Sequence, residues 1–328
     1  YLDRYTDTTY VWLTFDGEKG QRLYNQSSLT SSGSDTISTY VNRLHFEDDR
    51  KLLYYDADQP RTQLPYWQEN KIWSWFESWE LGTKKGFDFF INGLIKNSKV
   101  KTIVRAISSA ASISQPEKVH NVGVSFNNST NIGSQLFNKN QTVTFTQEFS
   151  SDLVFNGKNQ IFIHNIHTGI SPNTFLLDWF DIEYRRTLST NYNNPIYQND
   201  SLYFSIKDSI PKLQRFVKVT GISSDKILLY KTKPIIKRIY NFQLFGTDLK
   251  TLVFNDTLGL NDSYFITKET LVKKPKFLYK KLFLDLKQNN IGADYIIVSN
   301  NQLKNTVNSY SEFIKDNYKV RIQVSFVN

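Results

Sequence analysis

The sequence predicts a mainly β protein that consists of a jelly-roll sandwich, a second and smaller β-sandwich, and the start of an α/β domain. Short runs rich in Val, Ile, Thr, Tyr and Phe recur along the chain, and clusters of Asn, Gly, Ser and Asp separate them. Within these runs apolar and polar residues alternate, which is typical of antiparallel sheets with one buried and one solvated face. Helical periodicity is nearly absent before Leu303.

These patterns divide the chain into successive segments. Residues 1–66 form an amino-terminal β segment that could pair with the second sandwich, and residues 67–188 form the jelly-roll sandwich. The second sandwich spans 189–285 and begins with an Asn-rich connection, and 286–328 start the α/β domain. The predicted strands include Thr9–Phe15, Lys101–Ile107, Val122–Phe126, Thr142–Phe149, Gln160–Ile166, Leu176–Arg186, Gln214–Ile222 and Lys226–Thr232.

The segment Gly292–Asn328 predicts a strand, a helix and a second strand. The apolar residues of the predicted helix fall on one face, at Leu303, Val307, Tyr310 and Ile314. Two parallel strands joined by a helix need a larger parallel sheet around them, so this α/β domain is incomplete. We therefore expect the chain to be part of a longer product. The absence of Met, with Tyr1 as the first residue, supports that expectation.

The composition of the chain excludes several kinds of functional site and makes some partners unexpected. Cysteine is absent, which excludes disulfides, thiolate metal sites and a cysteine nucleophile within these 328 residues. No apolar run approaches the roughly 20 residues of a membrane-spanning helix. The net charge is +9, but the 40 Lys and Arg residues are scattered along the chain. Nucleic acid is therefore not an expected partner, and an anionic cell envelope fits the charge better.

No catalytic residue and no metal site are predicted. His164 and His167 have the spacing of metal ligands on a helix, but their run predicts a strand and places them on opposite faces. The acidic segment Glu47–Asp49 offers the oxygen ligands that calcium prefers, although a solvated acidic turn is the favoured interpretation. Asp178 and Asp181 allow the same two interpretations. No cofactor is predicted, and calcium stays an open alternative.

The stretch YWQENKIWSWFESWE, residues 66–80, is rich in tryptophan. Trp73, Trp75 and Trp79 could form a surface that binds sugar rings or aromatic side chains, because an indole has a large, rigid apolar face. The favoured alternative is that they hold a loop against the sandwich or fill an interface between domains. These three tryptophans are the candidate binding residues of the sequence.

Several stretches resemble, in order, the region ahead of the catalytic domain in gingipain-family cysteine peptidases, and most closely in the PorU-type sortases of type IX secretion. The similar stretches are YTDTTYVWLTFDGEKGQRL (5–23), LHFEDDRKL (44–52), WSWFESWELGTKKGFDFFINGL (73–94), TFLLDWFDIEYRR (174–186), RFVKVTGISSDKILLYKTKPII (215–236) and the final segment from Gly292. The chain departs from the family pattern at two places. Phe46 stands where Tyr is usual, and Tyr230–Thr232 replaces a common Asp, Ile or Val, Thr pattern.

The resemblance implies that the chain is the non-catalytic amino-terminal part of a secreted cysteine endopeptidase or transpeptidase. Its last segment would begin a caspase-like domain, and the catalytic Cys and His would lie beyond Asn328. A sortase of this family removes the C-terminal secretion signals of cargo proteins and attaches the cargo to anionic lipopolysaccharide. The implied partners are therefore an outer-membrane β-barrel, cargo proteins and this lipopolysaccharide, and the implied location is the cell surface at the outer membrane.

Two alternatives stay open at the level of sequence. The first is a secreted gingipain-like protease that is itself a cargo of the secretion system, because the departures at Phe46 and at Tyr230–Thr232 leave the subfamily undecided. The second belongs to a different class: a carbohydrate-binding or adhesive surface module in which the jelly roll is the working part. That module requires the tryptophans of residues 73–79 to line an exposed surface.

Overall fold

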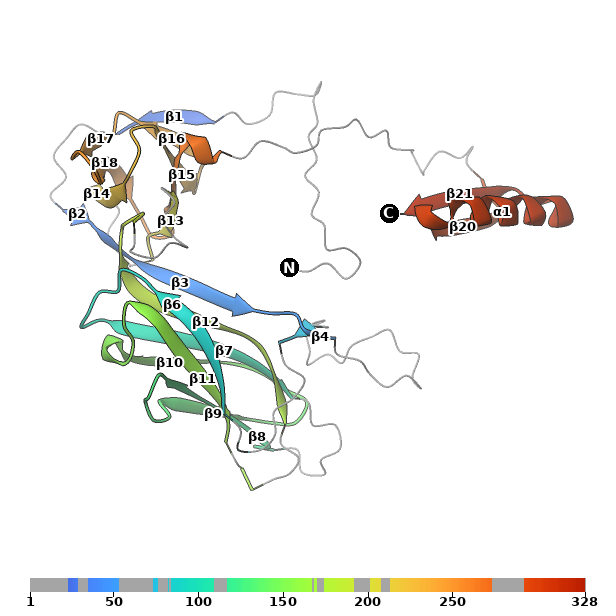
Figure 1. The fold of residues 1–328 in the computed structure, drawn as a ribbon, viewed down its shortest axis with the longest axis horizontal. Coiled ribbons are helices and arrows are strands. Elements are labelled where there is room, and N and C mark those ends of the chain that lie inside the picture. The colour runs from blue at the N-terminus through green and yellow to red at the C-terminus, as the bar shows by residue number, and fades with distance from the viewer. Residues whose placement is uncertain are drawn as a thin grey trace. The chain divides into compact units, whose positions relative to one another are not determined.

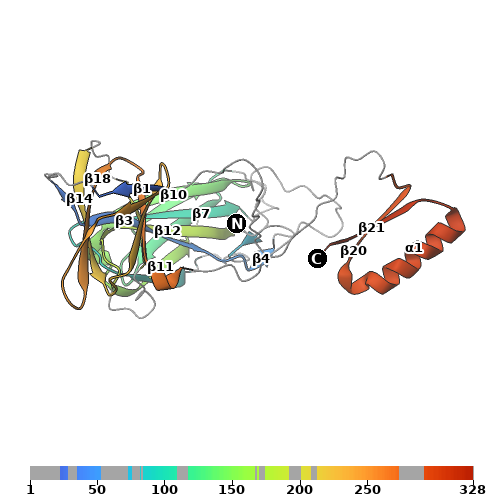
Figure 2. The same cartoon turned by 90° about the horizontal axis from the view of Figure 1, so that it is seen from above.

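The structure of the chain is a computed structural model that describes residues 23–28, 35–52, 73–75, 82, 84–108, 117–166, 168–169, 174–191, 201–207, 213–272 and 292–327. The predicted strand Thr9–Phe15, as well as His167 and Trp79, lies outside these residues. The chain divides into two compact units, Tyr1–Val272 and Lys273–Asn328. The first unit contains two β-sandwiches, and the second contains a strand, a helix and a strand (Figure 1, Figure 2). The predicted fold class, mainly β with successive sandwiches, is confirmed.

Two four-stranded antiparallel sheets form the first sandwich. One sheet contains, in spatial order, β10 (Thr142–Ser150), β7 (Lys99–Ser108), β12 (Phe175–Thr187) and β3 (Thr39–Glu47). The other contains β6 (Lys84–Ile91), β11 (Gly157–Asn165), β8 (His120–Phe126) and β9 (Gly133–Phe137). The 3-10 turn η2 (Ser151–Leu153) follows β10, and β4 (Lys51–Leu52) pairs with β5 (Trp73–Ser74).

The apolar face of each alternating strand supplies the core of the first sandwich. In β11, for example, every second residue is buried. Phe180 of β12 is fully buried at the centre of an aromatic group. The centre of its ring lies 4.9 Å from that of Phe46, 5.5 Å from that of Trp75 and 5.5 Å from that of Phe87. Because Phe46 and Phe87 belong to opposite sheets, Phe180 contributes to the packing between the two layers.

The second sandwich combines two strands that precede the jelly roll in the sequence with strands that follow it. Its larger sheet contains β1 (Tyr24–Ser27), β16 (Lys237–Tyr240), β15 (Ile227–Lys233), β19 (Ser263–Lys268) and β13 (Ser201–Ser205). Its smaller sheet contains β17 (Gln243–Phe245), β18 (Lys250–Leu258), β14 (Leu213–Ile222) and β2 (Thr36–Ile37). The turn η4 (Glu269–Leu271) follows β19. β1 and β2 join these sheets in parallel with β16 and β14, whereas the other pairs are antiparallel.

β3 connects the two cores of the first unit. Along its length it pairs with β12, and this pairing places it in the first sandwich. Tyr40, near its start, is nevertheless buried in the second core, where its ring lies 5.9 Å from that of Phe204. The chain leaves β12 beside the same point. There the N–H of Leu188 donates to the carbonyl oxygen of Ser38 at 2.7 Å. The carbonyl oxygen of Leu188 accepts from the N–H of Thr220 at 3.0 Å.

The second unit is a strand, helix, strand motif. β20 (Tyr295–Asn300) pairs in parallel with β21 (Ile322–Val327), and η5 (Asn301–Leu303) leads into α1 (Lys304–Tyr318). The helix predicted from Leu303 is therefore present, and it ends where Lys319 adopts the left-handed conformation. Beside the strands, Nη2 of Arg321 donates to Oδ1 of Asp294 at 2.9 Å. The hydrogen bonds from Arg321 lower the pKa of Asp294 to about 2.

Phe180→Ala is expected to lower the free energy of unfolding by about 3–5 kcal/mol, because it removes a fully buried ring and leaves a cavity between the sheets. Chemical denaturation followed by tryptophan fluorescence measures this change. Phe155→Ala is the matched control. Phe155 lies in the same sandwich but is 50% exposed, so its loss should change stability by less than about 0.5 kcal/mol. Equal losses in the two variants would contradict the assigned core.

Candidate functional site

A row of charged side chains crosses the outer face of β3 and β12. Arg43, His45 and Glu47 alternate along β3, and the strand register places His45 opposite Asp181 of β12. Asp181 is fully buried, and its carboxylate pairs with the guanidinium of Arg43 and lies 2.7 Å from Nδ1 of His45. Nε2 of His45 lies 3.1 Å from Oε2 of Glu47. The imidazole therefore lies between two carboxylates, with the ring of Trp179 packed 5.6 Å away.

These neighbours raise the pKa of His45 above its usual value. Partial burial acts to lower this pKa, but the hydrogen bonds and the charges of Asp181 and Glu47 outweigh the effect of burial. The hydrogen bond to Asp181 likewise raises the pKa of Arg43. The guanidinium of Arg43 compensates the buried carboxylate of Asp181, and the imidazole of His45 adds a second positive charge when it is protonated. These ion pairs join β3 to β12 and stabilise the sheet electrostatically.

Ion pairs also account for the acidic residues that the sequence left ambiguous. A bulge between Leu177 and Trp179 makes Asp178 an extra residue of β12, and its Oδ2 lies 3.1 Å from Nε of Arg105. Asp178 and Asp181 therefore have different partners. In the acidic segment after β3, Oδ2 of Asp48 lies 2.5 Å from Nε of Arg50. Across the described part of the chain, no group of three or more His, Asp or Glu side chains is placed to hold a metal ion.

The candidate tryptophans have different surroundings. The ring of Trp75 stacks on that of Phe180 at an interplanar angle of 6°, and its backbone N–H donates to the carbonyl oxygen of Leu177 at 2.9 Å. One face of this indole is therefore used in the core of the first sandwich. Trp73 is half-buried in β5, and Trp79 lies outside the described residues. Ligand binding by the tryptophans stays a prediction.

Two histidines contact serines inside the first sandwich. Nε2 of His120 lies 2.9 Å from Oγ of Ser108, and Nε2 of His164 lies 2.7 Å from Oγ of Ser125. Burial, and then the positive charge of Lys84, lower the pKa of His164. A hydrolytic serine must be reachable by its substrate, but Ser108 and Ser125 are both buried. These pairs are therefore structural contacts.

A hollow of about 310 Å³ lies between the two sandwiches of the first unit. Its lining comes from segment 35–40, from Arg185, from segment 205–207 and from Arg215. Nη1 of Arg185 donates to Oγ1 of Thr39 at 3.4 Å, and Nε of Arg215 lies 3.8 Å from a carboxylate oxygen of Asp35. Each of these contacts joins neighbouring strands of one sheet, since β12 pairs with β3 and β14 pairs with β2.

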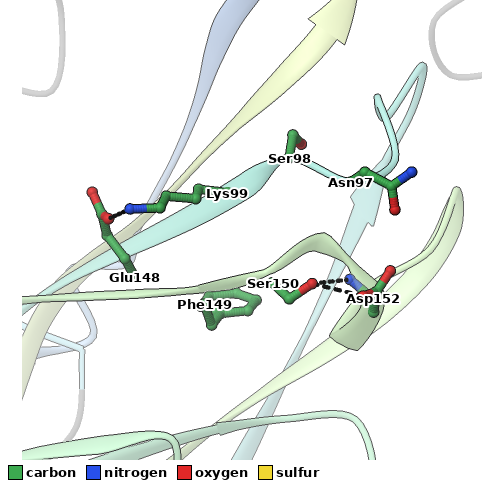
Figure 3. A pocket seen from close by; sticks show the side chains of 7 residues that line it. All are labelled: Asn97, Ser98, Lys99, Glu148, Phe149, Ser150 and Asp152. Carbon is green, nitrogen blue, oxygen red and sulfur yellow. Dashed lines mark hydrogen bonds and ion pairs between the residues drawn. The ribbon is translucent and has the colours of Figure 1, made fainter.

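A second hollow, of about 480 Å³, lies where β7 begins and β10 ends (Figure 3). Nζ of Lys99 donates to Oε2 of Glu148 at 3.0 Å across it. Oγ of Ser150 accepts from the N–H of Asp152 at 3.2 Å and donates to Oδ2 of the same residue at 2.8 Å. These contacts are a surface ion pair and the cap of η2, and the residues that line this hollow include no histidine.

The sequence did not predict the pairing of His45 with Asp181. A signal was present, because Arg43, His45 and Glu47 alternate on one face of a predicted strand. The partner could not be identified, because Asp181 is 136 positions away and meets His45 only through the register of β3 with β12. Among the described helices, none is long and apolar enough to cross a membrane.

Comparison with known proteins finds similarity in structure only. No protein-family model and no curated protein matches the sequence. The crystal structure of dimeric latent PorU from Porphyromonas gingivalis matches with a TM-score of 0.57 over 93% of this chain, at 12% sequence identity. The fold is PorU-like. The chain spans 27% of the length of that PorU chain, and at this identity the similarity shows the fold alone.

Two viral structures match more weakly than PorU. The subviral particle of infectious bursal disease virus VP2 has a TM-score of 0.26 at 7% identity, covering 73% of this chain and 44% of that chain. The STIV MCP has a TM-score of 0.23 at 8% identity, covering 71% of this chain and 96% of that chain. Scores this low carry no argument about this chain.

His45→Gln is expected to change how stability depends on pH. Because the pKa of His45 is raised in the folded state, its contribution is fully present below the unfolded pKa of about 6.5 and is lost as pH rises through the folded pKa. The difference in unfolding free energy between wild type and variant should therefore be largest below pH ~6.5. It should stay under about 1 kcal/mol, because the His45 side chain is 45% exposed.

Chemical denaturation over a series of pH values measures this difference. His164→Gln is the control with the opposite sign, because the pKa of His164 is lowered in the folded state. Its contribution should be present above pH ~6.5 and lost as pH falls through the folded pKa. A pH-independent difference for His45→Gln would contradict the assigned charge pair.

Proposed function

We propose that this chain is the non-catalytic amino-terminal part of a PorU-like sortase of type IX secretion, a gingipain-family cysteine peptidase. The observation that carries the proposal is the PorU-like fold, which extends over 93% of the chain and not over one sandwich alone. The stretches that resemble the family also occur in the family's order along the sequence. Fold alone does not determine function, so the proposal depends on both observations together.

In this proposal the two sandwiches support the enzyme, and other residues carry out its chemistry. The chain contains no cysteine, and in the described part of the chain the two serines that contact histidines, Ser108 and Ser125, are buried. We assign the catalytic Cys and His to residues beyond Asn328. There a thiolate would attack the scissile carbonyl of the cargo, the His would act as base and acid, and an amine or water would resolve the thioester.

The exposed apolar side chains of the second unit support its assignment to a larger α/β domain. Ile296 and Val298 of β20 are 66% and 65% exposed, and Phe313 of α1 is 57% exposed. Parallel sheets in α/β proteins are covered on both faces, so these side chains favour burial against further strands and helices. We assign β20, α1 and β21 to the first strand, helix and strand of the caspase-like peptidase domain that the sequence resemblance implies.

The proposed setting is the cell surface at the outer membrane. The proposed partners are an outer-membrane β-barrel that holds the enzyme, cargo proteins with C-terminal signals, and anionic lipopolysaccharide to which the cargo is joined. The net charge of +9 is compatible with attraction to an anionic envelope. In this setting the described sandwiches would position the peptidase domain and contact the barrel.

The gene beyond the codon for Asn328 provides the first test. We expect it to continue into an α/β domain that contains one Cys and one His in positions suited to a catalytic pair, because the chemistry must come from outside this chain. Reading the complete coding sequence from the genome or the transcript measures this. A stop codon shortly after that of Asn328 would exclude a peptidase domain and with it the proposed function.

A second test asks what the sandwiches do in the cell. Deleting residues 201–272 from the full-length gene removes most of the second sandwich and should leave most cargo proteins with uncleaved C-terminal signals. Mass spectrometry of cargo from the cell surface measures the uncleaved fraction, and Phe155→Ala in the same gene is the control that should process cargo normally. If the deletion leaves cargo processing intact, the proposed role of the second sandwich in supporting the sortase is wrong.

A further inference from the structure

A lysine and two aspartates form a buried charged cluster between the sheets of the second sandwich. Lys231 lies on β15 of one sheet and Asp256 lies on β18 of the other, while Asp262 directly precedes β19. Their side chains are 9%, 5% and 10% exposed, in that order. Lys231 belongs to Tyr230–Thr232, where the sequence departs from the pattern of the family that it resembles.

The amine of Lys231 contacts both carboxylates. Its Nζ lies 2.7 Å from Oδ2 of Asp262 and 3.0 Å from Oδ2 of Asp256, and it also donates to the carbonyl oxygen of Thr257 at 3.4 Å. Oδ2 of Asp262 accepts a further hydrogen bond from the N–H of Gly259 at 3.1 Å. One amine is thus held beside a carboxylate that could receive its proton and beside another that it could attack.

Both oxygens of Asp256 accept hydrogen bonds from other groups as well. Oδ1 accepts from Nε2 of Gln26 at 2.8 Å and from the N–H of Thr257 at 2.8 Å. Oδ2 accepts from the hydroxyl of Tyr264 at 2.7 Å. Burial, followed by the charge of Asp256, raises the pKa of Tyr264 far above its usual value, so this hydroxyl keeps its proton. Donors on both oxygens polarise the carboxyl carbon between them.

Aromatic rings surround the cluster. Nζ of Lys231 lies 5.5 Å from the centre of the Tyr264 ring, and the rings of Phe204 and Phe254 each lie 5.3 Å from that ring. Burying ions in such apolar surroundings has a large desolvation free energy, even when the ions are paired. Conversion of an ammonium and a carboxylate into one neutral amide would remove two of these charges.

We propose that Lys231 and Asp256 form an intramolecular isopeptide bond. A bond forms between Nζ of Lys231 and Cγ of Asp256, the bond between Cγ and Oδ2 breaks, and one water molecule leaves. Of the three hydrogens on the ammonium, one stays on the amide nitrogen and two leave with Oδ2 as water. The ammonium and the carboxylate charges cancel, so the step is balanced without an oxidant, a reductant or a cofactor.

Each neighbouring group has a role in this condensation. Asp262 accepts a proton from Nζ, so that the free amine can attack Cγ, and it returns the proton as Oδ2 departs. Gln26 and the N–H of Thr257 stabilise the negative charge that develops on Oδ1. The hydroxyl of Tyr264 hydrogen-bonds to the departing Oδ2. Because the fold holds the amine and the carboxyl side by side, the reaction has the advantage of an intramolecular step.

The bond would connect β15 to β18 and so join the two sheets of the second sandwich. A covalent cross-link restricts the unfolded chain, in the way that a disulfide does, and this chain has no cysteine with which to form one. The inference rests on contacts within the second sandwich and does not depend on the proposed function. The bond could form in a sortase, in a cargo protease or in an adhesive module alike.

Mass spectrometry of the intact, denatured chain of residues 1–328 tests the proposal. The expected mass is that of the sequence less one water molecule, and a protease digest should contain a branched peptide in which Lys231 is joined to Asp256. The full sequence mass after prolonged incubation of the folded protein would overturn the proposal. So would a loss of water without the branched peptide, since that indicates a cyclised aspartate elsewhere.

Two variants separate the reacting groups from their surroundings. Lys231→Arg keeps the positive charge but cannot form the amide, so it should have its full mass. Asp262→Asn keeps both reacting groups and removes the proton acceptor, so it should lose water at least about a hundredfold more slowly after refolding. Circular dichroism checks that each variant is folded.

Water loss in Lys231→Arg would overturn the cross-link, and an unchanged rate in Asp262→Asn would overturn the role of Asp262. The peptide digest of the wild-type chain decides the proposal even where a variant does not fold.

Discussion

The pairing of β3 with β12 is the contact on which the organisation of the first unit depends. One end of β3 places Tyr40 in the core of the second sandwich, where it packs against Phe204. The other end places Phe46 on Phe180 in the core of the first sandwich. A single strand therefore contributes to both cores while its backbone is paired along β12. Loss of that pairing would expose apolar surface in both sandwiches at once.

Each sandwich buries carboxylates, but the two sandwiches neutralise them in different ways. In the first, Asp181 lies under the surface, and the partly exposed side chains of Arg43 and His45 reach it from the solvent side. In the second, Lys231 and Asp256 are both buried, and the hydroxyl of Tyr264 lies among them. The first arrangement is expected to depend on pH, because its contacts with Asp181 and Glu47 raise the pKa of His45. The second excludes water, and exclusion of water favours condensation of the amine with the carboxyl group.

In the proposed function the two sandwiches have a supporting role. The PorU-like fold extends over 93% of the chain. The polar side chains described in the two sandwiches form ion pairs, a helix cap and buried contacts between serine and histidine. Such contacts stabilise sheets and position neighbouring domains. The apolar residues exposed on β20 and α1 indicate, by contrast, a surface suited to burial in a larger α/β domain. The proposed peptidase chemistry would belong to that domain.

Patterns in the sequence are enough to predict much of the local structure of this protein. Alternation predicted a strand at Leu176–Arg186, where β12 spans Phe175–Thr187, and the apolar spacing after Leu303 predicted the helix that is α1. These patterns are properties of neighbouring residues, so a single sequence contains them. The folded structure was needed to see that β1 and β2 join the second sandwich while β3 joins the first, and that Lys231 meets Asp256 across two sheets. Those contacts join residues that are distant along the chain, and no local pattern of apolar and polar residues specifies which distant strand becomes a partner.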